Sequence, residues 1–264
     1  MSSKSCICIS SLQKKFLMAI TGVLLFGFVI VHMLGNLQVF LGPDAINLYA
    51  YKLHSLPAFV MWGARLSLLL MVGVHILMAV KLTIENKKSR PREYDNEGTV
   101  QASYSSRTMP MTGLIVLSFI IFHILHYTSR VVPGMEYDDK IPSYSLEFED
   151  GSVKQVFDVY AMIVEGFSNY FVSFFYILSM GLLCMHLSHG LSSMFQTLGL
   201  RNKVWRPRLN NVARATALFI FIGFAAIPIS VFSGVLHHND SNTYSSLNSV
   251  NDVQNDNITS EGTQ

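Results

Sequence analysis

Five stretches of the chain are long and apolar enough to cross a lipid bilayer as helices. A spanning helix needs about 20 consecutive, mostly apolar residues. Each of the five stretches meets this length, and polar segments rich in charge separate them. The pattern predicts an all-α fold, an integral membrane bundle of five transmembrane helices within one domain, 16–236. The expected helices cover residues 16–41, 57–82, 109–131, 170–198 and 212–236.

The segments outside these helices carry signals of their own. Residues 1–15 form a short N-terminal segment, and the tail 237–264 is rich in Asn, Ser and Asp and is expected to be disordered. The acidic connection 132–169 contains SLEFEDGSVKQVFDVY, whose alternation predicts a short β-hairpin. Pro110 suits a helix start, and Pro228 is expected to kink the last helix.

The basic residues lie almost entirely on one side of the predicted bundle. The N-terminal segment and the connections between helices two and three and helices four and five carry 13 Lys and Arg residues, against 3 on the other side. The positive-inside rule therefore predicts a cytoplasmic N-terminus and an external C-terminus. Only 14% of the residues are charged, about half the share of a soluble domain. The basic residues form no aromatic-rich face, so nothing indicates nucleic-acid binding.

Histidines stand at bilayer depth in four of the five predicted helices. Ionisable residues inside a membrane are costly and mark functional sites. By helix rise, the histidines of the first and third helices lie roughly 21–24 Å from the inner surface, and that of the second helix lies roughly 10 Å deep. The depths predict an outer pair, His32 with His123, and an inner pair, His75 with His186. His126 and His189 each lie one turn from a member of these pairs.

Two imidazoles that face each other across a bundle can fill both axial positions of a haem iron. Such iron is suited to electron transfer, so the pairs predict two b-type haems. The stretches TGVLLFGFVIVHML and TGLIVLSFIIFHIL repeat one pattern, with Gly22 and Gly113 each ten residues before a histidine. The repeat favours His123 over His126 as the ligand.

Two further side chains are candidates for polar contacts with a cofactor. Arg65 lies in the second predicted helix at about the depth of His32. Its guanidinium needs an anion there, and the alternatives are a haem propionate or extension to the outer headgroups. His189 is a candidate contact to a haem carboxylate or a quinone oxygen. His54 belongs to an external connection and is expected to be exposed.

The residues resemble the five-helix, di-haem cytochrome b subunit that anchors bacterial succinate dehydrogenases and fumarate reductases. The resemblance covers residues 12–236. It rests on the repeated Thr-Gly and His pattern of helices one and three, on VHMLGNLQVFLGPDAINLYAYKLHSLP, on WGARLSLLLMVGVHI and on MHLSHGLSS. Matched by motif, the resemblance implies four haem ligands, with the first helix paired with the third and the second with the fourth: His32, His123, His75 and His186.

The resemblance also implies partners and a pathway. A flavoprotein subunit and an iron–sulfur subunit would bind the cytoplasmic face of the bacterial inner membrane, and electrons from succinate would pass through the inner and outer haems to a membrane quinone such as menaquinone. Some fumarate-reducing relatives carry a glutamate two residues before the ligand in helix four, and here that position is Cys184. No glutamate marks a quinone site in the external connection either, so that site stays unassigned.

The sequence leaves two alternative functions open. The chain could be the di-haem cytochrome b anchor of another quinone-linked dehydrogenase. A transporter that uses intramembrane histidines is a reading of another class, and it would need carboxylates beside them and broken helices. The first four predicted helices contain no Asp or Glu. The chain also has no dinucleotide-binding glycine motif and no cluster-binding cysteine set, so the oxidation of succinate belongs to partner subunits.

Overall fold

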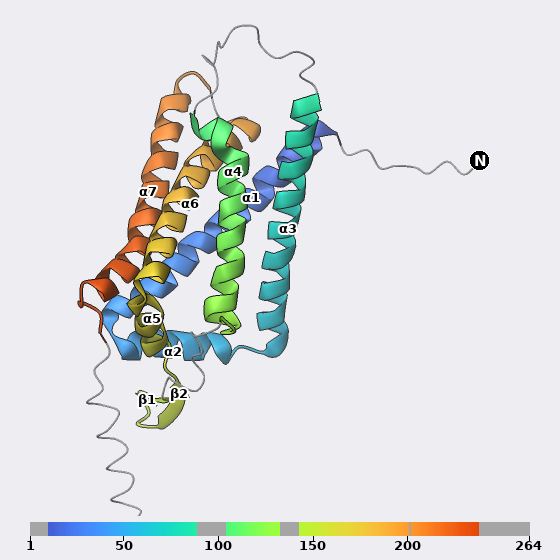
Figure 1. Cartoon of the computed structure of the whole chain (residues 1–264). Helices are drawn as coiled ribbons and strands as arrows, with labels where there is room; N and C mark the ends of the chain where they lie inside the picture. Colours follow the sequence, from blue (N-terminus) through green and yellow to red (C-terminus); the bar gives the residue numbers. More distant parts are fainter. Residues whose placement is uncertain (1–9, 89–103, 133–142, 201, 238–264) are drawn as a thin grey trace, which may run out of the picture.

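The fold is mostly helical, and five of its helices are long and apolar enough to span a membrane (Figure 1). The computed structural model describes residues 10–88, 104–132, 143–200 and 202–237. The prediction of a five-helix bundle is confirmed. The five spanning helices are α1 (Ser11–Asn36), α3 (Ala58–Lys88), α4 (Tyr104–His123), α6 (Tyr170–Thr197) and α7 (Trp205–Phe232).

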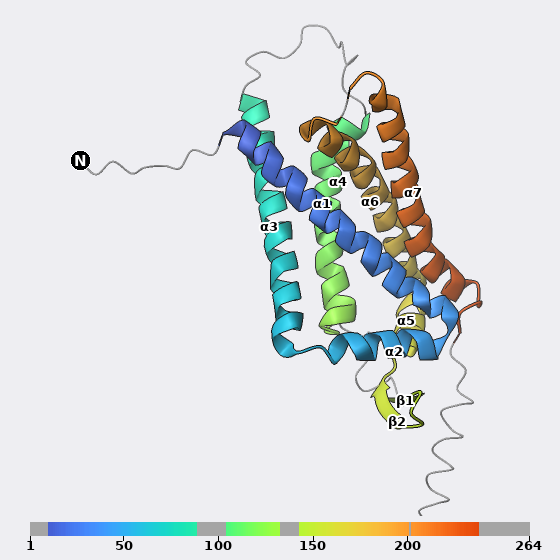
Figure 2. The same cartoon turned by 180° about the vertical axis from the view of Figure 1, so that it is seen from behind.

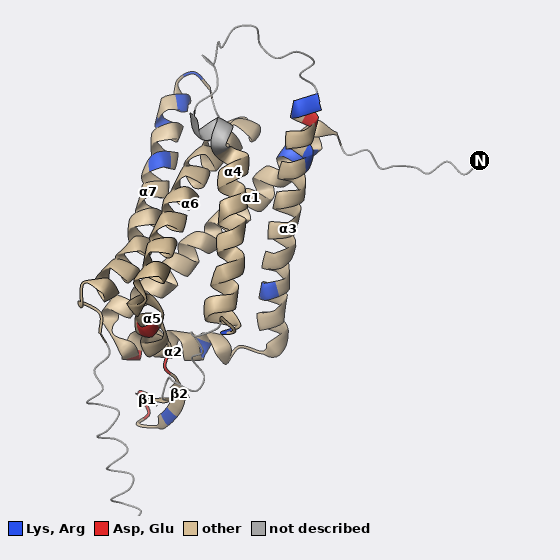
Figure 3. Cartoon of the chain, in the orientation of Figure 1, with Lys and Arg blue, Asp and Glu red and all other residues tan. Residues whose placement is uncertain are grey.

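The two ends of the bundle differ in charge and in structure. One end, called here the basic end, is where α1, α4 and α7 begin and where α3 and α6 finish, and Lys and Arg gather there (Figure 3). The opposite end, called the hairpin end, carries the short elements. These are a 3-10 turn (Leu37–Leu41), α2 (Pro43–His54), β1 (Ser143–Glu147), β2 (Val153–Phe157) and α5 (Val159–Ser168).

The β-hairpin predicted in the connection 132–169 is confirmed, with β1 and β2 paired antiparallel. The two short helices were not predicted, because each is shorter than a membrane span. Helix α2 begins with Pro43 at its first position, a place where proline's missing N–H costs nothing. Helix α5 begins at Asp158, whose side chain accepts the backbone N–H of Ala161 at 3.0 Å.

Hydrogen bonds connect the elements of the hairpin end. Asn47 of α2 donates to the carboxylate of Asp158 at 3.0 Å and accepts the backbone N–H of Val159 at 2.8 Å. The hydroxyl of Tyr144 in β1 donates to Asp44 at 2.7 Å. Burial raises the pKa of the Tyr144 phenol, and the hydrogen bond to Asp44 raises it further. Helix α2 is therefore the platform on which both the hairpin and α5 rest.

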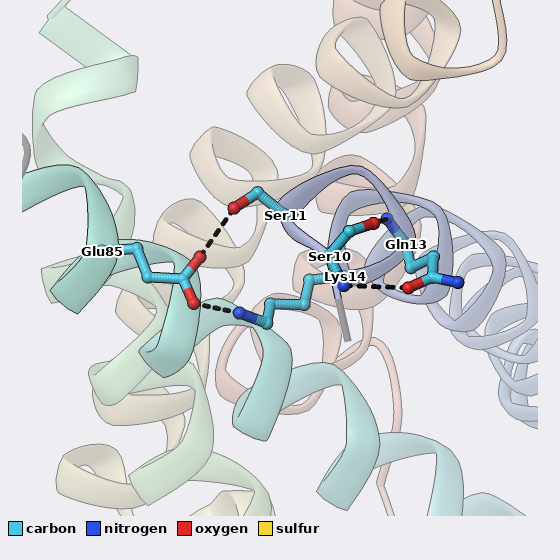
Figure 4. Close-up of polar contacts among 5 residues, drawn as sticks. All are labelled: Ser10, Ser11, Gln13, Lys14 and Glu85. Atoms are coloured by element: carbon cyan, nitrogen blue, oxygen red, sulfur yellow. Dashed lines mark hydrogen bonds and ion pairs between the residues drawn. The ribbon is translucent and has the colours of Figure 1, made fainter. Parts of the chain in front are cut away.

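Helix α1 crosses the bundle diagonally and links its two sides (Figure 2). At the basic end it packs on α3, where Lys14 forms an ion pair with Glu85 and Ser11 donates a second hydrogen bond to the same carboxylate at 3.0 Å (Figure 4). At the hairpin end it packs on α7, where Met33 lies directly over Gly223. The absent side chain of Gly223 lets these two helices approach closely.

Several helix boundaries differ from the predicted ones. Helix α3 continues six residues past 82 to Lys88. The prediction ended too early because these last turns are polar and give no apolar signal. Pro110 lies inside α4, so the prediction that it starts a helix was wrong. The α-helical part of α4 stops at His123 and a π-helical turn, Ile124–Thr128, continues it. Pro228 lies within α7. The predicted segments 1–9 and 238–264 fall outside the described residues.

Candidate functional site

The outer histidines meet near the hairpin end of the bundle. His32 in the last turns of α1 lies edge-on to His123 at the end of α4, with ring centres 5.8 Å apart and ring planes at 81°. Each imidazole also stacks on a phenylalanine one turn earlier in its own helix. The ring centres of Phe28 and His32 are 5.3 Å apart, and those of Phe119 and His123 are 5.8 Å apart. The two helices thus present their histidines in the same way.

Polar neighbours of the outer pair differ between the two histidines. The amide nitrogen of Asn36 lies 3.4 Å from Nε2 of His32, one turn later in α1. Nδ1 of His123 lies 3.3 Å from the hydroxyl of Tyr176 in α6. Both contacts are near the long limit for hydrogen bonds. Ring stacking therefore acts together with them in orienting the two imidazoles.

His126 lies in a different environment from His123. Its side chain is fully buried, and its Nδ1 is 3.0 Å from the same Tyr176 hydroxyl. Its ring centre is 4.1 Å from that of Tyr127 and 5.4 Å from that of Phe122. The π-helical turn contains His126, and such turns occur mostly at functional sites. The structure therefore places His123 against His32 and places His126 in an aromatic cluster beside them.

Each inner histidine is contacted by a threonine of the preceding spanning helix. The hydroxyl of Thr21 in α1 lies 3.1 Å from Nδ1 of His75 in α3. The hydroxyl of Thr112 in α4 lies 3.4 Å from Nδ1 of His186 in α6. Both threonines are buried. The two helix pairs, α1 with α3 and α4 with α6, therefore form the same contact.

The glycines that follow these threonines lie against the same imidazoles. A Cβ added to Gly22 would lie 3.4 Å from Cε1 of His75 and 3.8 Å from its Nδ1. A Cβ added to Gly113 would lie at the same two distances from the same atoms of His186. The repeated Thr-Gly pattern therefore faces the histidine of the next spanning helix. Sequence reasoning had related it only to the histidine of its own helix.

The side of α3 towards the rest of the bundle is sparsely covered. His75 and His186 lie within electrostatic range of each other, as do His186 and His189. Among the described residues, however, α3 packs extensively only on α1 and not on α4 or α6. No residue between 58 and 70 is buried. Arg65 is exposed in this stretch, and its guanidinium lies 5.4 Å from the ring centre of Trp62.

The donor set suits a haem better than a bare metal ion. Within the part of the chain that the structure describes, no group of three or more His, Cys, Asp or Glu side chains forms a metal cluster. A haem iron needs only two axial ligands from the protein. His32 and His123, whose ring centres are 5.8 Å apart, are the two side chains that would hold such an iron at the outer level.

Comparisons with known proteins identify no relative. No family model matches the sequence, and no curated protein and no solved structure matches it. The candidate site therefore rests on the residues themselves. Sequence reasoning named the histidines, but it missed Thr21 and Thr112 as their neighbours, and it missed Tyr176 and Asn36. The repeated Thr-Gly pattern was the available signal, and the partner of each threonine became visible only once the helices were placed.

Proposed function

We propose that this chain is the di-haem cytochrome b anchor of a succinate:quinone oxidoreductase in the bacterial cytoplasmic membrane. The proposal rests on histidines contributed by four helices of one bundle, of which the outer two meet and the inner two have matching threonine neighbours. His32 and His123 lie 5.8 Å apart by ring centres. His75 and His186 are each hydrogen-bonded by a threonine from the helix before them. A bound b haem supplies one-electron transfer at each level.

The proposal gives each pair one role. His32 and His123 bind the outer iron, and His75 and His186 bind the inner iron. Thr21, which contacts His75, precedes His32 by 11 residues in the same helix. At 1.5 Å per residue the two levels are therefore roughly 16 Å apart along α1. The chain holds two electron carriers in a line across the membrane and has no catalytic residue for succinate.

Charge supports the orientation and the partners. In the proposed topology the basic end of the bundle faces the cytoplasm, as the positive-inside rule requires. The flavoprotein and iron–sulfur subunits dock at this end, nearest to His75 and His186. Electrons leave at the outer level to a membrane quinone, for which menaquinone suits a di-haem anchor. His189, within electrostatic range of His186, is kept as a contact to a haem carboxylate or a quinone oxygen.

Arg65 is proposed as a partner of an outer haem propionate. It stands in the stretch of α3 in which no residue is buried. A prosthetic group on this side of α3 would cover that stretch and provide the anion that a guanidinium needs at bilayer depth. The contact with Trp62 also fits an arginine that extends to the headgroups. Arg65→Gln would alter the outer haem in the first case and would leave both haems unchanged in the second.

The deciding experiment is a reduced-minus-oxidised visible spectrum of the purified chain, with haem counted per chain. Two b-type haems per chain are expected from cells that make haem. A chain that contains no haem under these conditions would overturn the proposal. Haem bound without a flavoprotein or an iron–sulfur protein in complexes from native membranes would instead favour another quinone-linked di-haem cytochrome. Succinate-dependent reduction of the haems in the complex separates these two cases.

A further inference from the structure

The glycine of each Thr-Gly repeat lets helices approach, and the threonine hydroxyl beside it forms hydrogen bonds of a definite direction. Thr21 Oγ1 lies 2.8 Å from the backbone carbonyl of Leu17 and 3.1 Å from that of Met18. A hydroxyl has one proton to donate and two lone pairs that accept. Both carbonyl oxygens can only accept, and the contact with Leu17 is the shortest of the three, so we assign the proton of Thr21 to its own helix. Its lone pairs are left for the third neighbour, Nδ1 of His75.

This direction sets the tautomer of the imidazole. With the hydroxyl proton directed at its own helix, Nδ1 of His75, at 3.1 Å from Thr21 Oγ1, is the donor of that hydrogen bond. A neutral imidazole carries one proton, so an Nδ1–H tautomer leaves Nε2 with a free lone pair. Nε2 is on the far side of the ring from Nδ1 and from the threonine. The nitrogen that can bind a metal is therefore directed away from α1.

The second helix pair has a similar arrangement, with one carbonyl contact of its threonine described in place of two. Thr112 Oγ1 lies 3.1 Å from the carbonyl of Met109 and 3.4 Å from Nδ1 of His186. Gly113 lies against this ring just as Gly22 lies against His75, with the same two distances to the position of an added Cβ. Helix packing does not by itself require the same hydrogen bond in two segments that are 91 residues apart. Packing alone would accept valine, which has nearly the same shape as threonine, at both positions.

We propose that Thr21 and Thr112 are positioning residues that hold His75 and His186 as Nδ1–H tautomers with Nε2 directed at the inner iron. This inference rests on the proposed di-haem function. An acceptor on the second ring nitrogen fixes the orientation of a metal-bound histidine and raises its basicity. The inner iron therefore receives two ligands of matched basicity from two equivalent helix pairs. Among the described residues, the hydrogen-bond neighbours of the outer pair are Asn36 and Tyr176 and include no threonine.

The test compares two substitutions at Thr21 with a control at Thr83, each in the whole chain purified with its haems. Thr21→Val keeps the side-chain shape and removes the acceptor, and Thr21→Ser keeps the acceptor. Thr83→Val is the matched control, since Thr83 in α3 also donates to a carbonyl one turn earlier, Ala79 at 2.8 Å, and is exposed. The readouts are haem per chain, the electron paramagnetic resonance of each ferric haem, and the midpoint potential of each haem.

In Thr21→Val we expect the inner haem to bind about tenfold more weakly or worse, the usual cost of losing such a partner. Its resonance should change and its midpoint potential should rise, because a less basic ligand stabilises ferric iron less. The outer haem should keep its resonance and potential. Thr21→Ser should restore the inner haem, and Thr83→Val should leave both haems unchanged. If Thr21→Val does not accumulate, Thr112→Val makes the same test from the other helix pair.

The outcomes test the positioning role and the proposed function separately. Two haems per chain with an unchanged inner resonance and potential in Thr21→Val and Thr112→Val would overturn the positioning role alone. Equal changes in both haems would also overturn it, because the threonines would then act on the bundle as a whole. A wild-type chain without haem would overturn the proposed function and this inference with it.

Discussion

The two histidine pairs lie in one bundle but have different neighbours. Each inner imidazole contacts a threonine hydroxyl of the preceding spanning helix, His75 with Thr21 and His186 with Thr112. Each outer imidazole stacks on a phenylalanine one turn earlier in its own helix, and only one of the two, His123, has a hydroxyl neighbour among its described contacts, Tyr176 at 3.3 Å. A hydrogen bond fixes both the direction and the tautomer of a ring, whereas a stacked ring can still slide or turn in its plane.

The same repeated segment produces both kinds of support. Each copy begins with Thr-Gly, which faces the histidine of the next spanning helix, continues to a phenylalanine, and ends with a histidine of its own. In both α1 and α4, the first half of the helix therefore contacts an inner histidine and the second half supplies an outer histidine. The inner site therefore depends on how neighbouring helices pack, and the outer site depends more on local helix geometry.

The largest expected effect comes from removing one ligand from each pair. In the proposed arrangement His75→Ala should abolish the inner haem and keep the outer, and His32→Ala should do the reverse, so that haem per chain falls by half in each. His54→Ala is the control, because His54 is exposed and bonds only the carbonyl of Ala50, at 2.8 Å. Visible and resonance spectra identify which haem remains. Loss of both haems in either variant would show that the two levels are not independent.

The next effect tests the packing around the outer level. A Cβ added to Gly35 would lie 2.6 Å from the hydroxyl of Tyr49 in α2, so Gly35→Ala must displace the Tyr49 ring or the helix that carries it. Overpacking of this kind costs about 1–3 kcal/mol. Gly27→Ala in the same helix meets nothing within 4 Å and should stabilise the helix by up to about 1 kcal/mol. Denaturant unfolding in detergent measures both variants, and equal stabilities would contradict this account of Gly35.

A smaller effect is expected at Tyr176, whose hydroxyl lies between His123 and His126. Tyr176→Phe keeps the ring contacts and removes the hydrogen bonds, each worth about 1 kcal/mol. The outer haem should shift its midpoint potential, and the inner haem should not. Tyr170→Phe is the control, since Tyr170 is exposed at the start of α6. A shift of the inner haem in Tyr176→Phe would contradict the separation of the two levels.

Hydropathy was sufficient to predict the spanning helices, because burial in lipid demands long apolar runs. It could not predict where α3 ends, since Glu85 and Lys88 are polar yet remain helical. Helices α2 and α5 were missed because short amphipathic helices on a membrane protein carry no such signal. The depth argument predicted that His32 pairs with His123, whose rings do meet, and the pairing of His75 with His186 stays a prediction. The contact between Thr21 and His75 depends on how α1 tilts across α3, which no pattern within a single helix contains.

The smallest expected effect compares the glycines of the two repeats. A methyl group on Gly22 or Gly113 would touch Cε1 of an inner imidazole at 3.4 Å, which is the lower edge of ordinary contact. Alanine also favours a helix by up to about 1 kcal/mol over glycine, so the net change in stability should be under about 1 kcal/mol. Gly22→Ala and Gly113→Ala should each perturb the inner haem's resonance slightly, by similar amounts, and leave the outer haem unchanged. Similar shifts follow only if the two helix pairs are equivalent supports of one iron. A clear shift in one variant and none in the other would mean that the matched distances do not reflect a matched function.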